Sequence, residues 1–334
     1  MGAAKLQHDK PRVILGLLTF GPPGSEEHSA RVTSLDTFNS VLDHFQGQGY
    51  NEVDTARTYL NGMQESFTKE AKWKNRGLSL ATKCYPTLPG VHGKASIKER
   101  LETSLHELGT DQVDIWYLHA PDRSVAFEET LEACNELFEA GKLKRLGLSN
   151  YAAWEVAEIW NIANERNWIK PTVYQAMYNA CTRSIEDELV PCCQKYGIDI
   201  IAYNPLAGGM LSGKYKSNNT PSDGRFSSTD PNVGKMYRER YMSVANFEAL
   251  EMLEPVAKKH NLTMPEIAFR WLVHHSKLYI TDGNDGIVIG VSSLKQLENN
   301  LRDLEKPPLP AEVVGMLDDA WRDVTKASCP LYWR

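Results

Sequence analysis

The sequence predicts an α/β protein in which eight parallel strands, each followed by helical structure, close into a (β/α)8 TIM barrel. Two observations support this fold class. Eight short apolar runs recur along the 334 residues, and segments of helical periodicity separate them. Strands that alternate with helices form parallel βαβ units, and runs this apolar fit a sheet that is covered on both faces. A doubly wound open sheet is the alternative arrangement.

The expected strands each end in polar residues. They are VILGLLTF at 13–20, NEVDTA at 51–56, LSLATKC at 78–84, VDIWYLHA at 113–120, LKRLGLSN at 143–150, TVYQAMYN at 172–179, IDIIAYNP at 198–205 and GIVIGVSS at 286–293. An apolar stripe after Ser34 that stops at Gly47 predicts the first helix. A capping box of Ser96 and Glu99 predicts the start of another helix, which Gly109 ends.

One connection is much longer than the others. Between IDIIAYNP and GIVIGVSS lies a polar stretch at roughly 208–240, followed by helical patterns around 243–259 and 263–274. A long irregular segment beside a regular scaffold is usually a functional loop or a disordered one. We expect a single domain, 1–334, with this loop after strand 7 and a C-terminal tail over the site. The segment KLYITDGNDG at 277–286 is longer than expected before the last strand.

Charge and cysteine content argue against several classes of function. With 37 basic and 43 acidic residues the net charge is −6, which disfavours nucleic-acid or anionic-membrane partners. The N-terminus has no apolar signal segment, and no apolar run approaches the ~20 residues of a membrane span. The six cysteines are scattered without metal-ligand spacing, so no metal is expected. These features predict a cytoplasmic enzyme with reduced thiols.

Polar residues gather where the predicted strands end, which in a barrel is the location of the active site. Asp54, Lys83 and His119 end three successive strands, and Tyr59 lies just beyond the first of them. Taken singly, each has an ordinary structural explanation as a capping aspartate, a surface lysine, an edge-of-core tyrosine or a structural histidine. Four such residues at successive strand ends favour one shared site, because buried polar groups need partners.

This set of residues fits carbonyl reduction. A hydride that reaches a carbonyl carbon leaves negative charge on the oxygen, which then needs a proton donor. Tyrosine has an ordinary pKa of about 10, and a neighbouring ammonium lowers that pKa by stabilising the phenolate. We therefore expect Tyr59 to donate the proton and Lys83 to lower the pKa of Tyr59. Asp54 would hold Lys83 charged, and His119 would position the substrate oxygen.

Two later motifs suit phosphate groups. GGMLSGKY at 208–215 has Tyr215 where a nucleotide-hydrolysing P-loop needs Ser or Thr, yet its glycines and Lys214 can still cradle a pyrophosphate. GVSSLKQLENN at 290–300 is a strand-to-helix turn whose N-terminus suits a phosphate, although an ordinary N-cap by Ser292 or Ser293 explains it equally well. The absence of a convincing G-x-G-x-x-G disfavours a Rossmann dehydrogenase.

The order and spacing of seven stretches resemble the aldo-keto reductases over nearly the whole chain. The stretches are VDTARTY, ATKC, YLHAP, GLSNY, YQAMYN, YNPLAGGMLSGKY and VIGVSSLKQLENN. The LAGGMLSGKY loop, the SSLKQLENN turn and the terminal CPLYWR resemble the aflatoxin-aldehyde and succinic-semialdehyde reductase branch. The resemblance implies a barrel that binds NADPH without a Rossmann domain and reduces aldehydes to alcohols, with Tyr59 as general acid.

The resemblance also implies which residues bind the cofactor. The nicotinamide amide would be hydrogen-bonded by Ser149, Asn150 and Gln175, and Tyr203 would stack on the ring. The pyrophosphate would be covered by residues 204–214, among them Asn204, Pro205, Leu206, Gly208 and Lys214. The adenosine 2′-phosphate end would be held by Ser292, Ser293, Gln296 and Asn300, together with Arg225.

For the substrate, the resemblance implies a small carbonyl compound beside His119, Tyr241 and Arg334, because the C-terminal arginine of this branch binds substrate carboxylates. Met242 stands where relatives carry an aromatic residue. Members of the branch commonly form homodimers. Two other interpretations stay open: a Schiff-base aldolase with Lys83 as nucleophile, and a cofactor-binding regulatory protein on the same barrel.

Overall fold

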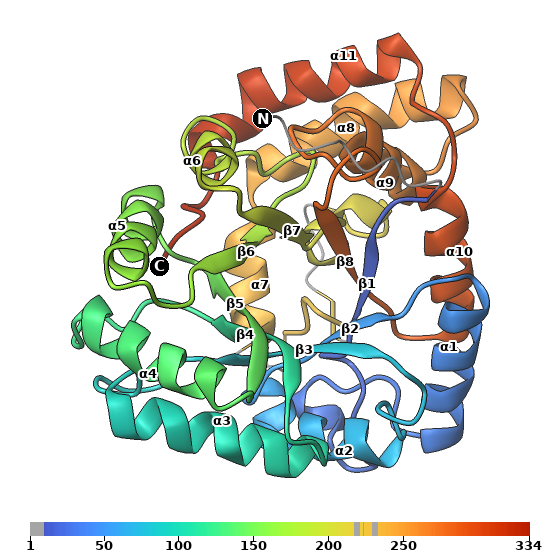
Figure 1. The fold of residues 1–334 in the computed structure, drawn as a ribbon. Coiled ribbons are helices and arrows are strands. Elements are labelled where there is room, and N and C mark those ends of the chain that lie inside the picture. The colour runs from blue at the N-terminus through green and yellow to red at the C-terminus, as the bar shows by residue number, and fades with distance from the viewer. Residues whose placement is uncertain (1–9, 217–220, 223, 229–232) are drawn as a thin grey trace.

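The eight predicted strands form one closed parallel barrel. The computed structural model describes residues 10–216, 221–222, 224–228 and 233–334. The strands pair in chain order and β1 also pairs with β8, so the barrel prediction is confirmed and the open-sheet alternative is wrong (Figure 1). The strands are β1 (Val13–Gly16), β2 (Glu52–Asp54), β3 (Ser79–Cys84), β4 (Val113–Leu118), β5 (Leu143–Ser149), β6 (Pro171–Met177), β7 (Asp199–Tyr203) and β8 (Gly286–Gly290).

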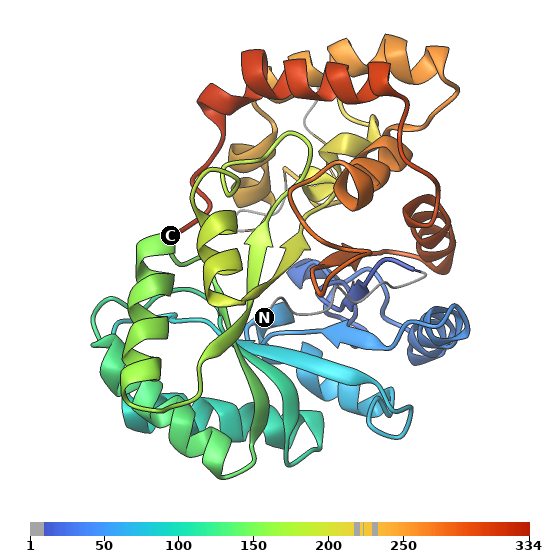
Figure 2. The same cartoon turned by 45° about the horizontal axis from the view of Figure 1, so that its top comes forward.

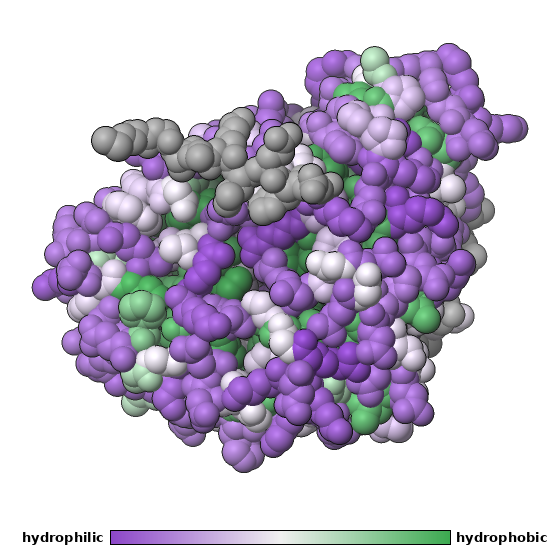
Figure 3. Space-filling model, turned by 45° about the vertical axis from the view of Figure 1, so that its right-hand side comes forward, coloured by the Kyte–Doolittle hydropathy of each residue, from purple (hydrophilic) through white to green (hydrophobic). Residues whose placement is uncertain are grey.

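Most of the helices surround this barrel, whereas α7 is seen behind the centre of the ring of strands in Figure 1 (Figures 1 and 2). The helices are α1 (Leu35–Gly47), α2 (Gln64–Glu70), α3 (Lys94–Leu108), α4 (Phe127–Glu139), α5 (Ala153–Glu165), α6 (Leu189–Tyr196), α7 (Val233–Tyr241), α8 (Val244–Lys259), α9 (Met264–His274), α10 (Leu294–Leu304) and α11 (Ala311–Asp319). The face in Figure 3 is mostly hydrophilic, with small and separate apolar patches. No helix in the described part of the chain is long and apolar enough to cross a membrane.

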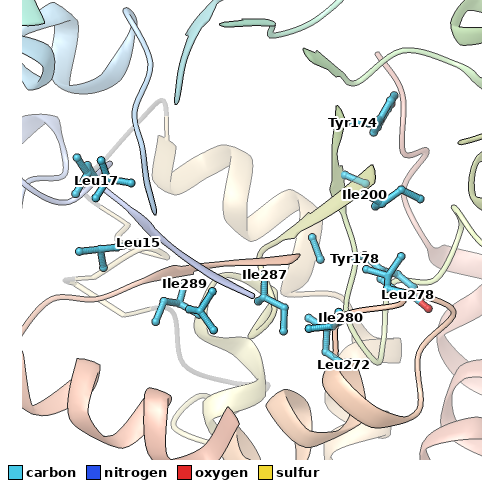
Figure 4. Packing of buried hydrophobic residues seen from close by; sticks show 14 of the residues in the cluster. Leu15, Leu17, Tyr174, Tyr178, Ile200, Leu272, Leu278, Ile280, Ile287 and Ile289 are labelled. Atoms are coloured by element: carbon cyan, nitrogen blue, oxygen red, sulfur yellow. The ribbon is translucent and has the colours of Figure 1, made fainter. Parts of the chain in front are cut away.

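The core lies mainly between the strands and the surrounding helices. Figure 4 shows Ile287 of β8 close to Ile280, Leu278, Leu272 and Tyr178, all of them buried. Each fully buried side chain of this size contributes about 1.5–3 kcal/mol relative to an exposed one. This outer layer therefore stabilises the barrel without using its interior, where the polar site residues lie.

The barrel interior is sorted by polarity from one end to the other. At the N-terminal ends of the strands, Arg12 pairs with Glu52 at 2.7 Å and Arg145 pairs with Asp199 at 2.6 Å. A separate apolar cluster fills the middle and consists of Ile14, Ala81, Ile115, Tyr117, Val173 and Ile201. Polar side chains collect at the C-terminal ends of the strands, the location expected for the active site of such a barrel.

Tyr117 reaches its place inside the barrel because Gly147 lies beside it on the next strand. A Cβ atom on Gly147 would lie 2.3 Å from Cδ1 of the Tyr117 ring, much closer than two carbon atoms can approach. The ring lies beside Lys83, whose Nζ is 5.8 Å from the ring centroid. Gly147 is thus needed for packing directly under the polar end of the barrel.

One predicted helix start is confirmed and another is wrong. Helix α1 begins after Ser34, where the apolar stripe places it, and Ser34 accepts a hydrogen bond from the Thr37 amide. In contrast α3 begins at Lys94, two residues before the expected Ser96. The cause is a tertiary contact, because the Lys94 amide donates to the Glu129 carboxylate of α4 at 2.9 Å.

The long connection before β8 is more helical than its composition indicates. Helices α8 and α9 fall where the periodicity places them, but α7 occupies Val233–Tyr241, most of which was expected to be loop. Residues 217–220, 223 and 229–232 of the predicted loop lie outside the described residues. Helix α7 packs against the turn η3 (Ala207–Ser212), where a Cβ on Gly208 would lie 2.5 Å from the Tyr237 ring.

The unexplained segment 277–286 lies at the opposite end of the barrel from the polar residues. Leu278 and Ile280 are buried in the core, and the Asp285 carboxylate accepts hydrogen bonds from the Ile200 amide at 2.6 Å and the Tyr279 amide at 2.8 Å. Burial raises the pKa of Asp285 to about 6, and the two backbone donors oppose that shift. The segment thus anchors the start of β8 to the start of β7.

We predict that Gly147→Ala lowers the free energy of unfolding by about 1–3 kcal/mol, because the added methyl forces Tyr117 out of its position. Gly315→Ala in α11 is the matched control, since nothing lies within 4 Å of its added Cβ. The control should gain about 0.5–1 kcal/mol from better helix propensity. Urea unfolding followed by circular dichroism measures both changes, and equal effects would contradict the packing argument.

We predict that Asp285 gives stability a specific dependence on pH. The unfolded chain holds this proton only below about pH 4, whereas the folded chain holds it up to about pH 6. The folded state binds more protons in that window, so the contribution of this group to stability falls as pH rises. The free energy of unfolding of the wild type minus that of Asp285→Asn should fall by about 3 kcal/mol from about pH 4 to pH 7.

Asp282→Asn, in the exposed part of the same loop, is the control for this pH dependence. It should leave the pH profile of unfolding as it is in the wild type. If the free energies of unfolding of the wild type and Asp285→Asn differ by the same amount from about pH 4 to pH 7, Asp285 is ionised in the folded protein throughout that range.

Candidate functional site

Four residues predicted from strand ends converge at one mouth of the barrel. Lys83 of β3 is fully buried, and its ammonium hydrogen-bonds the Asp54 carboxylate at the end of β2. The same ammonium donates to the Thr55 carbonyl at 2.6 Å and to the Tyr59 hydroxyl at 3.3 Å. The Tyr59 and His119 rings meet edge to face, with centroids 6.2 Å apart.

All three N–H groups of Lys83 therefore have an acceptor. Burial lowers the pKa of Lys83, and the Asp54 carboxylate opposes this shift. The second Asp54 oxygen accepts a hydrogen bond from Gln175 Nε2 at 2.9 Å, which ties the ion pair to β6. Since the phenol oxygen of Tyr59 accepts from Lys83, the phenol proton remains available to another acceptor.

The turn that carries Tyr59 is held by an ion pair between a partly buried arginine and a buried glutamate. Leu60 and Asn61 have positive φ angles of 49° and 55°, an uncommon conformation that the surroundings must enforce. Arg57 donates to the Gly62 carbonyl at 2.6 Å and pairs with Glu65 at 2.5 Å. The other Glu65 oxygen accepts from the Thr82 hydroxyl at 2.6 Å, so the turn is fixed to the strand residue next to Lys83.

The net shift of the Tyr59 pKa is opposite in direction to the one expected from the sequence. Burial raises the pKa of Tyr59 well above 10, and the Asp54 charge adds to that increase. The physical reason is that burial disfavours the charged phenolate by more than the Lys83 ammonium, already paired with Asp54, can offset. Tyr59 accordingly stays protonated throughout the neutral pH range.

His119 is held in its neutral form. Burial lowers its pKa well below 6.5, and the positive charges of Lys83 and Arg334 lower it further. Its backbone is fixed by hydrogen bonds from its amide to the Cys84 carbonyl at 2.9 Å and from Asn150 Nδ2 to its carbonyl at 2.7 Å. Its ring atom Nδ1 is buried and has no hydrogen-bond partner within the described part of the chain.

The residues expected to contact a nicotinamide lie together at the ends of β5, β6 and β7. Ser149 Oγ donates to the Gln175 carbonyl at 2.8 Å, and the Tyr203 hydroxyl donates to Asn150 Oδ1 at 3.3 Å. Asn204 follows with a φ angle of 56°, and its side-chain amide donates to the Tyr241 hydroxyl at 2.9 Å. Tyr241 is fully buried, and its ring also contacts that of Tyr237, with centroids 6.0 Å apart.

The two phosphate motifs form the turns that their sequences predict. Pro205 and Leu206 lead into η3, where Gly208, Gly209 and Gly213 have φ angles of 69°, 108° and 72°, and Lys214 beyond it is exposed. At α10, Ser293 Oγ accepts from the Gln296 amide at 3.2 Å and Gln296 Oε1 accepts from the Ser292 amide at 2.8 Å. This reciprocal capping fixes the conformation of the helix N-terminus. Asn300, further along α10, is buried.

An unpartnered nitrogen of Arg225 indicates whether a dinucleotide could fit at this site. Its guanidinium lies 5.1 Å from the Tyr237 ring centroid, and its Nη1 atom is buried without a hydrogen-bond partner in the described regions. Its positive charge acts to lower the pKa of Tyr59, which places it close to that phenol. A buried guanidinium nitrogen without an acceptor suits an anionic group, so the residues fit a cofactor that carries phosphates.

Sequence reasoning missed three residues around the site. Arg240 of α7 lies 5.9 Å from the ring centroids of Tyr237 and Tyr241, and Tyr117 lies under Lys83. Arg123 contacts Arg334. The long loop's basic residues could have indicated Arg240, but no local pattern indicates the other two, since their roles depend on contacts across the fold.

This fold, with its Tyr59, Lys83, Asp54 and His119 at one mouth, is that of a barrel oxidoreductase. The chain belongs to the aldo/keto reductase family, whose sequence model matches residues 12–322. It is 43% identical over 299 residues to an aldo-keto reductase of Pseudocercospora fijiensis, covering 87% of this chain and 100% of that one. These findings confirm the predicted family.

Two mammalian relatives match over most of their length. The chain is 39% identical over 341 residues to aldo-keto reductase family 7 member A3 of Homo sapiens, which covers 99% of each chain. It is 41% identical over 341 residues to aflatoxin B1 aldehyde reductase member 2 of Mus musculus, which covers 97% of this chain and 88% of that one. The predicted branch of the family is confirmed by these relatives.

We predict strong coupling between Asp54 and Lys83 in a double-mutant cycle. Asp54→Asn and Lys83→Met should each cost about 3–5 kcal/mol of stability, because each leaves one buried charge unpaired. The double variant should lose much less than the sum, since it buries no charge. Urea unfolding of all four proteins measures the coupling.

The exposed pair Lys216 and Glu254, 2.6 Å apart, is the control cycle. Its coupling should be at most about 1 kcal/mol, because solvent screens an exposed pair. Additive losses at Asp54 and Lys83 would contradict the view that they are mutually dependent charges.

Proposed function

We propose that this oxidoreductase reduces aldehydes to alcohols with NADPH, and that Tyr59 donates the proton to the carbonyl oxygen. The observation that carries the proposal is the hydrogen bond from Lys83 to the Tyr59 oxygen at 3.3 Å. It directs the phenol proton away from Lys83 and toward the mouth that His119 also borders. Relatives named as aflatoxin B1 aldehyde reductases support an aldehyde as substrate.

Each of the four residues has a separate task in this proposal. Tyr59 gives its proton to the carbonyl oxygen, and Lys83 then stabilises the phenolate through the hydrogen bond it already makes. Asp54 keeps Lys83 charged, and neutral His119 holds the carbonyl oxygen by a hydrogen bond from a ring N–H. NADPH, when bound, supplies the hydride that adds to the carbonyl carbon.

The cofactor assignment follows from where the predicted binding residues lie. Ser149, Asn150 and Gln175 would hold the carboxamide beside the Tyr203 ring. The η3 loop, from Asn204 to Lys214, would cover the pyrophosphate. Arg225 was expected at the 2′-phosphate end, but because its charge acts on Tyr59 we propose instead that its unpartnered Nη1 would meet an anionic group near the catalytic end. For the 2′-phosphate that distinguishes NADPH from NADH, we assign the N-terminus of α10 with Ser292, Ser293, Gln296 and Asn300.

For the substrate we propose a small aldehyde, including one that bears a carboxylate. Arg334 lies at the mouth, where its charge acts on both His119 and Tyr203, and it would attract such a carboxylate. Tyr241 would shape the pocket through Asn204. We also propose that residues 1–334 act as one domain, in the cytoplasm and as a homodimer.

The hydrogen bonds of the Lys83 amine disfavour the aldolase interpretation. A Schiff-base lysine needs a free, uncharged amine, whereas Lys83 donates all three of its N–H groups and pairs with Asp54. The regulatory interpretation requires tight cofactor binding without turnover, which the next experiment tests.

We predict that the wild type oxidises NADPH with 4-nitrobenzaldehyde and with succinic semialdehyde, and that NADH serves less well. Tyr59→Phe should reduce kcat by about 10²–10⁴-fold, because the proton donor is lost while the ring remains. Loss of absorbance by the reduced cofactor measures turnover, and protein fluorescence quenching should show unchanged NADPH binding.

Tyr196→Phe, a half-buried tyrosine of α6, is the matched control and should retain wild-type kcat. Normal turnover by Tyr59→Phe would require a different acid. Tight NADPH binding without turnover of any aldehyde by the wild type would favour the regulatory interpretation.

A further inference from the structure

The tail at residues 329–334 is anchored at two separate points. At the first, the Tyr332 hydroxyl donates to Glu188 at 2.8 Å and accepts from the Ala153 amide at 3.0 Å. Tyr332 itself is buried. This anchor fixes the tail to the N-terminal ends of α5 and α6, two residues before Arg334.

The second anchor is Arg123, in the connection between β4 and α4. Its guanidinium pairs with the fully buried Glu155 carboxylate through two hydrogen bonds of 2.7 and 3.1 Å. The same guanidinium donates to the Arg334 backbone oxygen at 2.5 Å and lies 5.7 Å from the Trp333 ring centroid. Glu155 accepts from the Ala152 amide as well, so it is fixed independently of Arg123.

Arg334 is thereby held at the mouth of the barrel. Its backbone amide donates to the Asn150 carbonyl at 3.0 Å, and Asn150 in turn contacts His119 and Tyr203. The Arg334 side chain extends to Met236 of α7, with Nη2 3.9 Å from the sulfur atom. Its guanidinium therefore lies between the end of β5 and α7, beside the proposed carbonyl site.

We propose that Arg123 is a positioning residue that sets selectivity for anionic aldehydes by holding Arg334 at the mouth of the site. The proposal rests on the function proposed above. Arg123 does not touch the reacting atoms; it aligns the last residues of the tail so that the Arg334 guanidinium faces a carboxylate on the substrate. The planar fork of arginine suits this task, since it serves Glu155 and the Arg334 oxygen at once.

A comparison of two substrates tests the effect on selectivity. In Arg123→Met the KM for succinic semialdehyde should rise about tenfold, while kcat and KM for the uncharged 4-nitrobenzaldehyde stay within about twofold. Arg123→Lys keeps the charge but lacks the fork, so it should lose most of the selectivity as well. In the Arg334→Ala background, Arg123→Met should change selectivity no further, because its effect runs through Arg334.

Arg166→Met is the matched control, since Arg166 makes an exposed pair with Glu128 elsewhere. It should leave both substrates unaffected. Full selectivity in Arg123→Lys would show that charge alone acts, and additive effects with Arg334→Ala would show a route that bypasses Arg334. Either result would overturn the proposal, as would equal changes for both aldehydes in Arg123→Met.

Hydrogen exchange of the tail provides a measurement that does not depend on turnover. Amides of 329–334 should exchange faster in Arg123→Met than in the wild type and Arg166→Met, because the Arg334 amide loses its fixed geometry. Unchanged exchange would overturn the proposal whatever the kinetics show. Absence of turnover by the wild type with both aldehydes would refute the proposed function instead, and the exchange result would still decide whether Arg123 holds the tail.

Discussion

A lysine charge buried inside the barrel is the constraint on which the site depends. An ammonium in such a place is costly unless every N–H finds an acceptor. Lys83 meets this requirement with the Asp54 carboxylate, the Thr55 carbonyl and the Tyr59 phenol. All three acceptors come from β2 and the turn after it. The pairing register of β2 with β3 therefore determines whether the site exists at all.

The other side chains inside the barrel keep further charges away from the Lys83 ammonium. Gln175 occupies the second oxygen of Asp54, and the Tyr117 ring fills the space beneath Lys83. The other interior charges described here pair with each other at the opposite end, where Arg12 meets Glu52. An apolar layer separates the two ends, so removing a side chain from this layer alters the surroundings of the ion pair as well as the packing.

Features set by local pattern could be predicted from the sequence, and features set by tertiary partners could not. The eight strands and the four residues at one mouth follow from apolar runs that end in polar residues. The start of α3 does not, because Glu129 from another helix caps it. The helical conformation of α7 was missed for the same kind of reason, since Tyr237 packs on Gly208 of a distant turn. The raised pKa of Tyr59 depends first on burial of the phenol and then on the nearby Asp54 charge, which residue types alone do not reveal.

The raised pKa of Tyr59 is compatible with its proposed task. An alkoxide is the conjugate base of an alcohol, which is a far weaker acid than a phenol, so even a buried phenol can transfer a proton to it. With Tyr59 protonated and His119 neutral, the oxyanion of the proposed reaction would meet two uncharged hydrogen-bond donors. In the proposed step the Lys83 ammonium would stabilise the phenolate that Tyr59 becomes, through the hydrogen bond that it already makes. Burial would keep Tyr59 protonated before the step.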